Sequence, residues 1–279
     1  MLHALGLVVL RVLLCATGAT VASSSAGYSF ANTFGDSMVL QRNAPLSLWG
    51  TGNCSAGCTV ALQQGPSCAT RLCNASVSTT SDGSSQSFQA TLPPMPASGA
   101  EWMPAGPMAI ILLSGSNVVA MLSDVLVGDV VLVSGQSNVG ISVNYSNQFN
   151  WTAQLENQEE ADRVGPRLRL MAVGQGTQPT EQRQLTHEVP CKLPSAQCGC
   201  LRWARANHSN IVGYSALGWY LGRALYAAQH EAVPIGIIQS DVPGTPIQVR
   251  TSHHRTVVHR RFLPSVCACA RVHLRNFLR

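Results

Sequence analysis

The chain has 279 residues, of which 46% are apolar and only 11% are charged, which favours a folded protein of one large or two ordinary domains over a disordered chain. The formal net charge is +5, but residues 250–279 hold seven arginines and no acidic residue, so the rest of the chain has a net charge of −2. A mildly acidic body excludes a general basic surface, and we expect no nucleic-acid partner.

The first 22 residues predict a cleaved secretory signal peptide. Arg11 lies within an apolar stretch, and the small residues 20–23 follow that stretch. A signal anchor is the alternative interpretation, but the apolar run is short for a membrane span. No other long apolar run occurs in the sequence, so we expect no stable membrane span after signal cleavage.

Glycosylation and disulfide signals agree with secretion. Five Asn-x-Ser/Thr acceptors predict a glycoprotein, and they begin at Asn53, Asn74, Asn144, Asn150 and Asn207. Two cysteine clusters favour disulfides in an oxidising compartment, although their pairing cannot be read from the sequence: Cys54, Cys58, Cys68 and Cys73, then Cys191, Cys198 and Cys200. We expect no metal site, because Cys54-x3-Cys58 lacks a second pair with zinc-like spacing and nearby histidines.

Residues 28–120 predict a β-rich N-terminal domain. Short apolar runs are separated there by Ser, Thr, Gly and Pro, and they show no helical period. This pattern is typical of antiparallel strands in a small sandwich. The runs are 38–40, 46–49, 59–62, 87–92 and 108–113.

Residues 122–248 predict part of an α/β domain with a parallel sheet. An apolar, β-branched run over 125–133 predicts a buried strand, and alternating apolar residues over 168–172 predict a second one. Residues 214–230 predict a helix, and 233–238 a third strand, which together form a β-α-β unit. The helix shows apolar residues on one face at i, i+3, i+4 spacing: Leu217, Tyr220, Leu221, Ala224, Leu225 and Ala228.

An acidic run covers residues 154–162. A cation site is one interpretation of these carboxylates, but a solvated loop or helix face is favoured.

The run Ser134-Gly135-Gln136-Ser137-Asn138 follows the strand 125–133 and is the candidate catalytic block. A polar turn at the carboxyl end of a parallel strand is where α/β folds place ligands and chemistry. Ser137 can act there as a nucleophile, and its backbone N–H can stabilise an oxyanion. Gly244 lies in the loop after the third predicted strand, so we expect both residues at one edge of the sheet.

Two other serine motifs compete with Ser137. Gly35-Asp36-Ser37 lies in the β-rich region without a long preceding strand or a following helix, so a turn is favoured. Ser116, in the run 114–117, lacks an α/β context and is expected in a loop. Ser137 itself does not fit Gly-x-Ser-x-Gly, because position 139 is valine, so an α/β-hydrolase elbow is not indicated.

The block 134–138 resembles the first block of the SGNH hydrolases, in the branch of the sialate O-acetylesterases. The resemblance extends over about 28–248. Residues 30–42 with Leu48-Trp49-Gly50 resemble the family's N-terminal β-domain, and Trp203 with 214–223 resembles its conserved helix. Residues 233–238 with Gly244-Thr245-Pro246-Ile247 resemble its glycine-bearing second block.

This resemblance implies a flavodoxin-like hydrolase domain entered through a β-domain, and an activity that removes acetyl groups from O-acetylated sialic acids or other acetylated glycans. Ser137 would be the nucleophile, and the N–H groups of Ser137 and Gly244 would hold the oxyanion. Gln136 and Asn138 would have positioning roles only. The resemblance implies no metal or other cofactor, and an extracellular or lysosomal location reached through the secretory pathway.

The chain also departs from the family pattern. The family's second block has a Trp-Gly-Gly run where this chain has Asp241-Val242-Pro243-Gly244, and Pro243 has no N–H to donate. The third block has no match, and no Asp-x-x-His occurs anywhere in the 279 residues. Without the base that this last motif supplies, a serine hydroxyl is a weak nucleophile, so we expect low activity and an incomplete hydrolase domain.

Residues 249–279 resemble nothing in the family. One interpretation of their histidines is a catalytic base or a metal site. An abrupt Arg- and His-rich segment is more typical of translation through an unspliced or shifted segment, and a basic appendage for glycans or membrane surfaces is the alternative. Two other functions remain open for the chain: a non-catalytic glycan-binding protein or pseudoenzyme, and an acetyl-xylan-type esterase.

Overall fold

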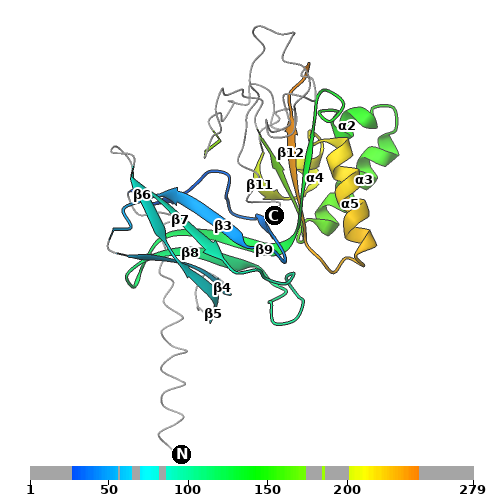
Figure 1. The fold of residues 1–279 in the computed structure, drawn as a ribbon. Coiled ribbons are helices and arrows are strands. Elements are labelled where there is room, and N and C mark those ends of the chain that lie inside the picture. The colour runs from blue at the N-terminus through cyan, green and yellow to red at the C-terminus, as the bar shows by residue number, and fades with distance from the viewer. Residues whose placement is uncertain are drawn as a thin grey trace, which may run out of the picture.

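The computed structural model describes residues 27–55, 57–64, 70–81, 86–173, 184–185 and 201–244. The predicted signal peptide, the second cysteine cluster and the arginine-rich residues 250–279 lie outside the described residues. Figure 1 shows a β-rich half beside an α/β half, with α2, α3 and α5 grouped on one side of the α/β sheet.

The β-rich half contains two sheets that share one core. The smaller sheet has the order β1 (Ser29–Phe30), β3 (Leu46–Thr51), β7 (Gln86–Leu92), β6 (Ser78–Ser81). The other sheet begins with β5 (Thr70–Ser76), β4 (Cys58–Gln64) and β8 (Met108–Ser114), and all these pairs are antiparallel, as predicted. Apolar side chains from both sheets meet in the core: Leu48, Phe88, Leu62, Ile110 and Leu112.

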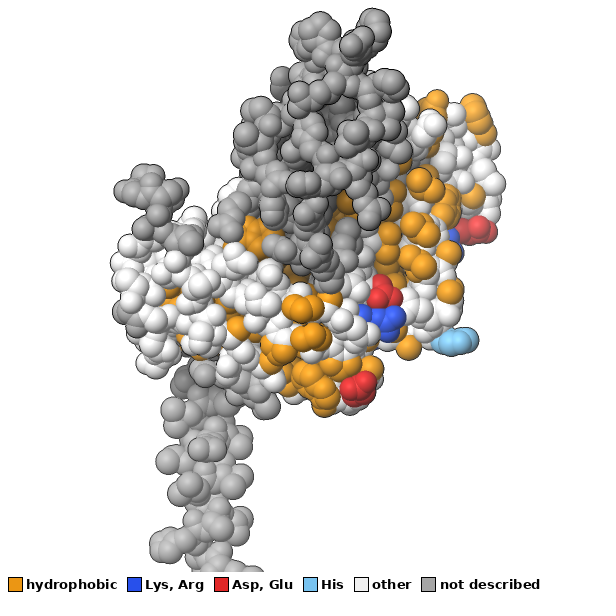
Figure 2. Space-filling model, viewed as in Figure 1, with side chains coloured by type: hydrophobic (Ala, Val, Ile, Leu, Met, Phe, Trp, Pro, Cys, Tyr) orange, Lys and Arg blue, Asp and Glu red, His pale blue; other side chains and the backbone are white. Residues whose placement is uncertain are grey.

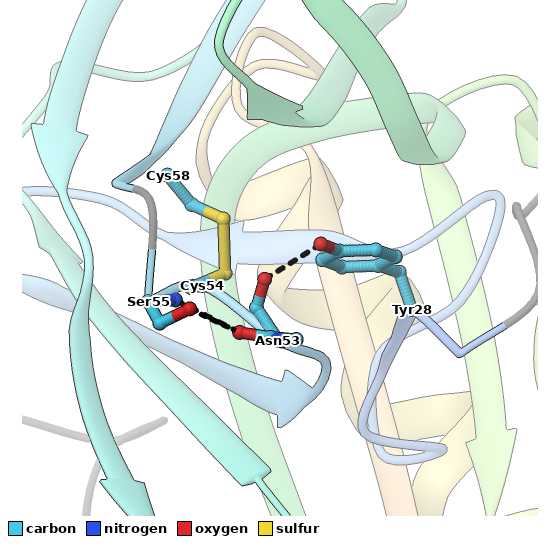
Figure 3. Close-up of a disulfide and its surroundings, with 5 residues drawn as sticks. All are labelled: Tyr28, Asn53, Cys54, Ser55 and Cys58. Carbon is cyan, nitrogen blue, oxygen red and sulfur yellow. Dashed lines mark hydrogen bonds between the residues drawn. A yellow bond between two sulfur atoms is a disulfide. The ribbon is translucent and has the colours of Figure 1, made fainter.

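A disulfide closes the turn before β4. Cys54 and Cys58 are bonded with a Cα–Cα distance of 5.2 Å, and both side chains are buried, which confirms a disulfide within the first cysteine cluster. In Figure 3 the hydroxyl of Tyr28 donates to the backbone carbonyl of Asn53 at 2.6 Å, next to this disulfide. Cys73 of the same cluster is a free thiol, and burial raises its pKa.

The strand β9 (Asn117–Gly135) runs through both halves of the molecule (Figure 1). Its first part pairs with β8, its middle pairs in parallel with β2 (Val39–Gln41), and residues 129–135 pair in parallel with β12 (Ile235–Asp241). The predicted boundary between the β-rich domain 28–120 and the hydrolase domain 122–248 therefore falls within one continuous strand. The division into these two domains stays a prediction.

The α/β half contains the predicted parallel strands and one additional strand. Its part of the sheet has the order β11 (Leu201–Arg205), β10 (Leu168–Ala172), β12, β9. The pairs β10–β12 and β12–β9 are parallel, whereas β11 is antiparallel to β10 and was not predicted. Four helices accompany these strands in the described residues: α2 (Val143–Ser146), α3 (Trp151–Val164), α4 (His208–Ile211) and α5 (Ala216–Ala228).

The helix α5 forms where its periodicity predicts, but its sheet-facing side is not the large apolar stripe. Its buried residues are Ala216, Gly218, Trp219, Gly222 and Tyr226, whereas Leu217, Tyr220 and Leu221 are exposed. The reason is close approach to β12: a Cβ on Gly222 would overlap the side chain of Ile237, and one on Gly218 would lie 3.5 Å from it. The two glycines let the helix approach the sheet, where Trp219 and Tyr226 are also buried, whereas the side chains of Leu217, Tyr220 and Leu221 remain exposed.

The acidic run forms part of a helix face, as favoured by the sequence. It lies in α3, where Glu160 accepts from Arg163 at 2.7 Å and lies 3.6 Å from Arg223 on α5. Arg163 also reaches Glu231 at 2.8 Å. Within the ranges that the structure describes, no group of three or more His, Cys, Asp or Glu residues could hold a metal ion.

A cluster of charged side chains connects the two halves beside β9. Asp124 has a φ of 57° and accepts hydrogen bonds from Arg169 on β10 at 2.6 Å and from Arg205 on β11 at 2.7 Å. The hydroxyl of Ser37 also donates to Asp124 at 2.7 Å, so the competing serine of the run 35–37 lies in a structural turn, as predicted. Burial alone would raise the pKa of Asp124, but these three donors outweigh burial and hold the pKa well below its usual range.

In the part of the chain that the structure covers, no helix has both the length and the apolar character needed to cross a membrane.

Candidate active site

Ser137 lies in an exposed turn at the carboxyl end of β9, as the sequence predicts. The turn is closed by the backbone carbonyl of Gln136, which accepts from the N–H of Val139 at 2.9 Å and from that of Gly140 at 3.3 Å. Gln136, Ser137 and Asn138 are all exposed, while Val139 is buried and anchors the turn. The arrangement presents the Ser137 hydroxyl to solvent from a fixed backbone.

Two glycines are required at the ends of this turn. A Cβ on Gly135 would overlap the side chain of Val139, which folds back over it. A Cβ on Gly140 would lie 2.7 Å from a carboxylate oxygen of Asp241 and 3.4 Å from the carbonyl of Ser137. The absence of a side chain at Gly135 therefore lets Val139 fold back within the turn, and its absence at Gly140 lets the turn pack closely against Asp241 of β12.

Gly244 follows β12 on the same edge of the sheet as Ser137. The parallel register pairs Ser240 with Ser134 and Asp241 with Gly135, so the two strands end side by side. Gly244 is exposed in the turn that follows and has a φ of 73°, a conformation that favours glycine. Within the described residues, the N–H groups of Ser137 and Gly244 have no hydrogen-bond acceptor.

A series of hydrogen bonds between buried polar groups of β12 and α5 supports the Ser137 turn. The side chain of Gln239 donates to Asp241 at 2.8 Å and accepts from the backbone N–H of Ser215 at 2.9 Å. The hydroxyl of Ser215 in turn accepts from the N–H of Gly218 at 3.1 Å and caps α5. These hydrogen bonds connect the start of α5 to the Asp241 carboxylate that lies against Gly140. The sequence alone did not reveal this connection.

Removal of the Asp241 carboxylate is expected to destabilise this edge of the sheet. In Asp241→Ala the buried amide of Gln239 loses its acceptor, which costs about 1–3 kcal/mol of unfolding free energy. Asp241→Asn keeps an acceptor oxygen and is expected to lose less than half as much. Urea unfolding of both variants measures the difference, and equal losses for Ala and Asn would contradict this role of the carboxylate.

No histidine base for Ser137 lies among the described residues. Their histidines are His208 and His230, and both are exposed at the opposite end of the sheet, where β10 and β12 begin. His208 opens α4 after the antiparallel strand β11, and its N–H donates to Asp162, near the end of α3. His230 follows the end of α5. The histidines of residues 250–279 lie outside the described residues.

The five glycosylation acceptors lie at different kinds of position. Asn53 lies in the turn before β4, and Asn74 lies on β5. Asn144 lies in α2 and Asn150 caps α3, and both are exposed. Asn207 is half-buried and caps α4, where its side chain accepts from the N–H groups of Ser209 and Asn210 and donates to the carbonyl of Arg205.

A cavity of about 280 Å³ lies between α3 and α5. Its lining includes Glu160, Tyr220 and Arg223, and none of its residues belongs to the turns of Ser137 or Gly244. It is therefore separate from the candidate active site.

Comparison with known proteins identifies relatives over most of the chain. Sialate O-acetylesterases from Pongo abelii and Homo sapiens are each 32% identical to it over 236 residues, and the one from Rattus norvegicus is 31% identical over 231 residues. The chain is homologous to the sialate O-acetylesterases. These alignments cover 82%, 82% and 81% of the chain. The chain spans only about 40% of the length of these sialate O-acetylesterases: 40%, 40% and 38%, respectively.

A solved structure supports the fold. A carbohydrate acetylesterase from Xanthomonas citri matches the chain with a TM-score of 0.57 and 24% sequence identity. The match covers 79% of this chain and 42% of that protein. The α/β fold expected from the resemblance to the sialate O-acetylesterases is therefore confirmed. No protein-family model matches the chain.

Proposed function

We propose that the chain carries the nucleophile-bearing part of a carbohydrate O-acetylesterase whose substrates are O-acetylated sialic acids. The observation that carries the proposal is the position of Ser137, exposed at the carboxyl end of β9 and next to the turn of Gly244 at the end of β12. The homology to sialate O-acetylesterases supports the substrate class.

The proposed reaction is a two-step acyl transfer. The Ser137 oxygen attacks the acetyl carbonyl, and the sugar hydroxyl leaves with a proton, which gives an acetyl-serine. Water then attacks the acetyl-serine, acetate is released, and the serine hydroxyl is restored. Gln136 and Asn138 lie in the same exposed turn and are proposed to position the substrate without taking part in proton transfer.

The oxyanion of each tetrahedral intermediate requires donors that are not already engaged. The N–H groups of Ser137 and Gly244 meet this requirement in the described part of the chain, because neither donates to a protein acceptor there. Pro243 can supply no further donor. Two backbone donors are therefore proposed for the oxyanion site.

A specific observation favours a second candidate function. Neither described histidine lies near Ser137, and no Asp-x-x-His occurs in the 279 residues. A non-catalytic protein that binds acetylated glycans without cleaving them would have the same exposed turns and no base. Glycan binding that is unchanged in Ser137→Ala, together with no acetate release from any substrate, would favour this alternative.

Substrate preference tests the proposed function. Acetate release by the chain is expected to be about tenfold faster, at equal ester concentration, from O-acetylated sialic acid than from acetylated xylan. An aryl acetate, which carries no sugar, serves as the control substrate. A preference for xylan would replace the sialate proposal by the acetyl-xylan-type esterase.

The proposal includes passage through the secretory pathway to an extracellular or lysosomal location. The signal-like residues 1–22, the five glycosylation acceptors and the disulfide between Cys54 and Cys58 support it.

A further inference from the structure

The helical side of the molecule carries aromatic side chains that no described element covers. Phe149 is 95% exposed, Trp151 is 71% exposed and Tyr145 is 59% exposed. Leu155 lies one turn after Trp151 on α3 and is also exposed. We name these four residues the aromatic face. Figure 2 shows further hydrophobic side chains exposed over the neighbouring helix α5.

The exposed stripe of α5 is held beside α2 and α3, the two helices that carry Tyr145 and Trp151. Tyr220 contributes to that stripe, and its hydroxyl accepts from Asn147 at 2.8 Å and from Asn157 at 3.2 Å, which fixes α5 beside α2 and α3. Groups of large exposed apolar side chains on a folded protein often mark a surface that something covers. An occupant is therefore expected.

Two glycosylation acceptors lie within the aromatic face itself. Asn150 stands between Phe149 and Trp151 in the sequence, and Asn144 directly precedes Tyr145. Both asparagines are exposed, as is Thr152, which completes the acceptor sequence of Asn150. No other predicted acceptor has two highly exposed aromatic residues as its immediate neighbours.

The side chain of Asn150 can carry a sugar without loss of its structural role. Its Oδ1 accepts from the N–H of Ala153 at 3.0 Å and caps α3. N-linked glycosylation uses the Nδ2 atom, which has no hydrogen-bond partner among the described residues, and leaves Oδ1 in place. The cap and the modification are therefore compatible on one residue.

We propose that an N-linked glycan on Asn150 covers the aromatic face, with its first sugars packed on Phe149 and Trp151. The C–H groups on the flat side of a pyranose ring are complementary to the electron-rich face of an aromatic ring. A glycan on Asn144 covers Tyr145 in the same way. The proposal rests on the proposed secretory location and does not depend on the esterase activity.

The test uses the full 279-residue chain expressed in a secretory eukaryotic host. Glycopeptide mass spectrometry is expected to find sugar on Asn150. Thr152→Ala removes the acceptor sequence and retains Asn150 as the cap of α3, so this variant isolates the glycan from the helix cap. It is expected to bind an apolar fluorescent dye about twofold more strongly than the parent chain.

A matched variant removes a glycan from the other half. Ser55→Ala abolishes the acceptor sequence of Asn53, whose Oδ1 accepts from Ser55 near the disulfide (Figure 3). Dye binding by this variant is expected to equal that of the parent. Adding Phe149→Ser and Trp151→Ser to Thr152→Ala is expected to return dye binding to the parent level.

Each contrary result has a distinct meaning. Sugar at other acceptors but not at Asn150 overturns the proposal, as does unchanged dye binding by Thr152→Ala when Asn150 is glycosylated in the parent. A glycosylated chain that dimerises, and that Phe149→Ser with Trp151→Ser makes monomeric, would assign the face to a second copy instead. Absence of sugar at all five acceptors would contradict the secretory location together with this proposal.

Discussion

Replacement of Ser137 by alanine is expected to abolish acetyl-ester hydrolysis by this chain. The variant removes the atom that forms the acetyl intermediate and leaves the turn intact, because Gln136, Val139 and Gly140 hold its backbone. In a chain with a complete base, loss of a nucleophilic serine costs a factor of about 10³ or more in rate. Acetate release from O-acetylated sialic acid measures the loss.

The matched control is Ser116→Ala, which is expected to leave the rate unchanged. Ser116 lies in the turn between β8 and β9 at the other end of the long strand. It thus belongs to a competing serine motif that is remote from Gly244. Hydrolysis that persists in Ser137→Ala, or that disappears in Ser116→Ala, would contradict the assignment of the nucleophile.

The 279 residues by themselves are expected to turn over slowly, at about a thousandth of an ordinary esterase rate or less, because no Asp-x-x-His is present. Added imidazole can replace a missing histidine base, so it is expected to raise acetate release in the parent chain more than in Ser137→Ala. Fast turnover without imidazole that depends on Ser137 would show that a base is present in these residues after all.

Replacement of Asp124 by asparagine is expected to cost about 3–5 kcal/mol of unfolding free energy. The change leaves the guanidinium of Arg169 in the interior without a counter-charge, and that side chain is only 1% exposed. Asparagine tolerates the positive φ of position 124, so the loss reports the charge more than backbone strain. Urea or thermal unfolding measures it.

The control for this prediction is Arg205→Gln. Arg205 also bonds to Asp124, but its side chain is 51% exposed, so its removal is expected to cost less than about 1 kcal/mol. Equal effects of Asp124→Asn and Arg205→Gln would contradict the view that burial of Arg169 sets the cost.

The same cluster gives a definite pH dependence. The pKa of Asp124 is lower in the folded protein than in the unfolded chain, so the folded state binds this proton less readily. Its contribution to stability is therefore complete above the unfolded pKa of about 3.9 and is lost as the pH falls below that value. The unfolding free energy of the parent chain is therefore expected to decrease as the pH falls through this range, by a component that Asp124→Asn lacks.

Local signals predicted the position of Ser137 and most of the described strands, although β1, β5, β6 and β11 were missed. The apolar run 125–133 ends in small polar residues, and this change marks the end of a strand and an exposed turn regardless of the surrounding fold. The glycine after the third strand was found in the same way. Both predictions needed only the sequence on either side of one strand end.

Interactions between distant residues were not predictable in this way. The apolar pattern of α5 predicted the wrong buried face. The helix packs on the sheet through the close approach of Gly222 to Ile237, and the larger apolar side chains of Leu217 and Leu221 are left exposed. Nothing in the sequence around Asp241 reveals the side chain of Gln239 or the turn at Gly140 that it contacts. Asp124 and its arginines are 45 and 81 residues apart in sequence.

The continuity of β9 through both halves has a consequence for unfolding. Its 19 residues contribute Val125 and Val127 to one core and Val133 to the other. Neither half can release its segment of this strand without stripping backbone hydrogen bonds from the edge of the other. We therefore expect both halves to unfold in a single cooperative transition on heating. We also expect proteolytic cleavage near residue 121 to destabilise both halves and to release neither of them intact.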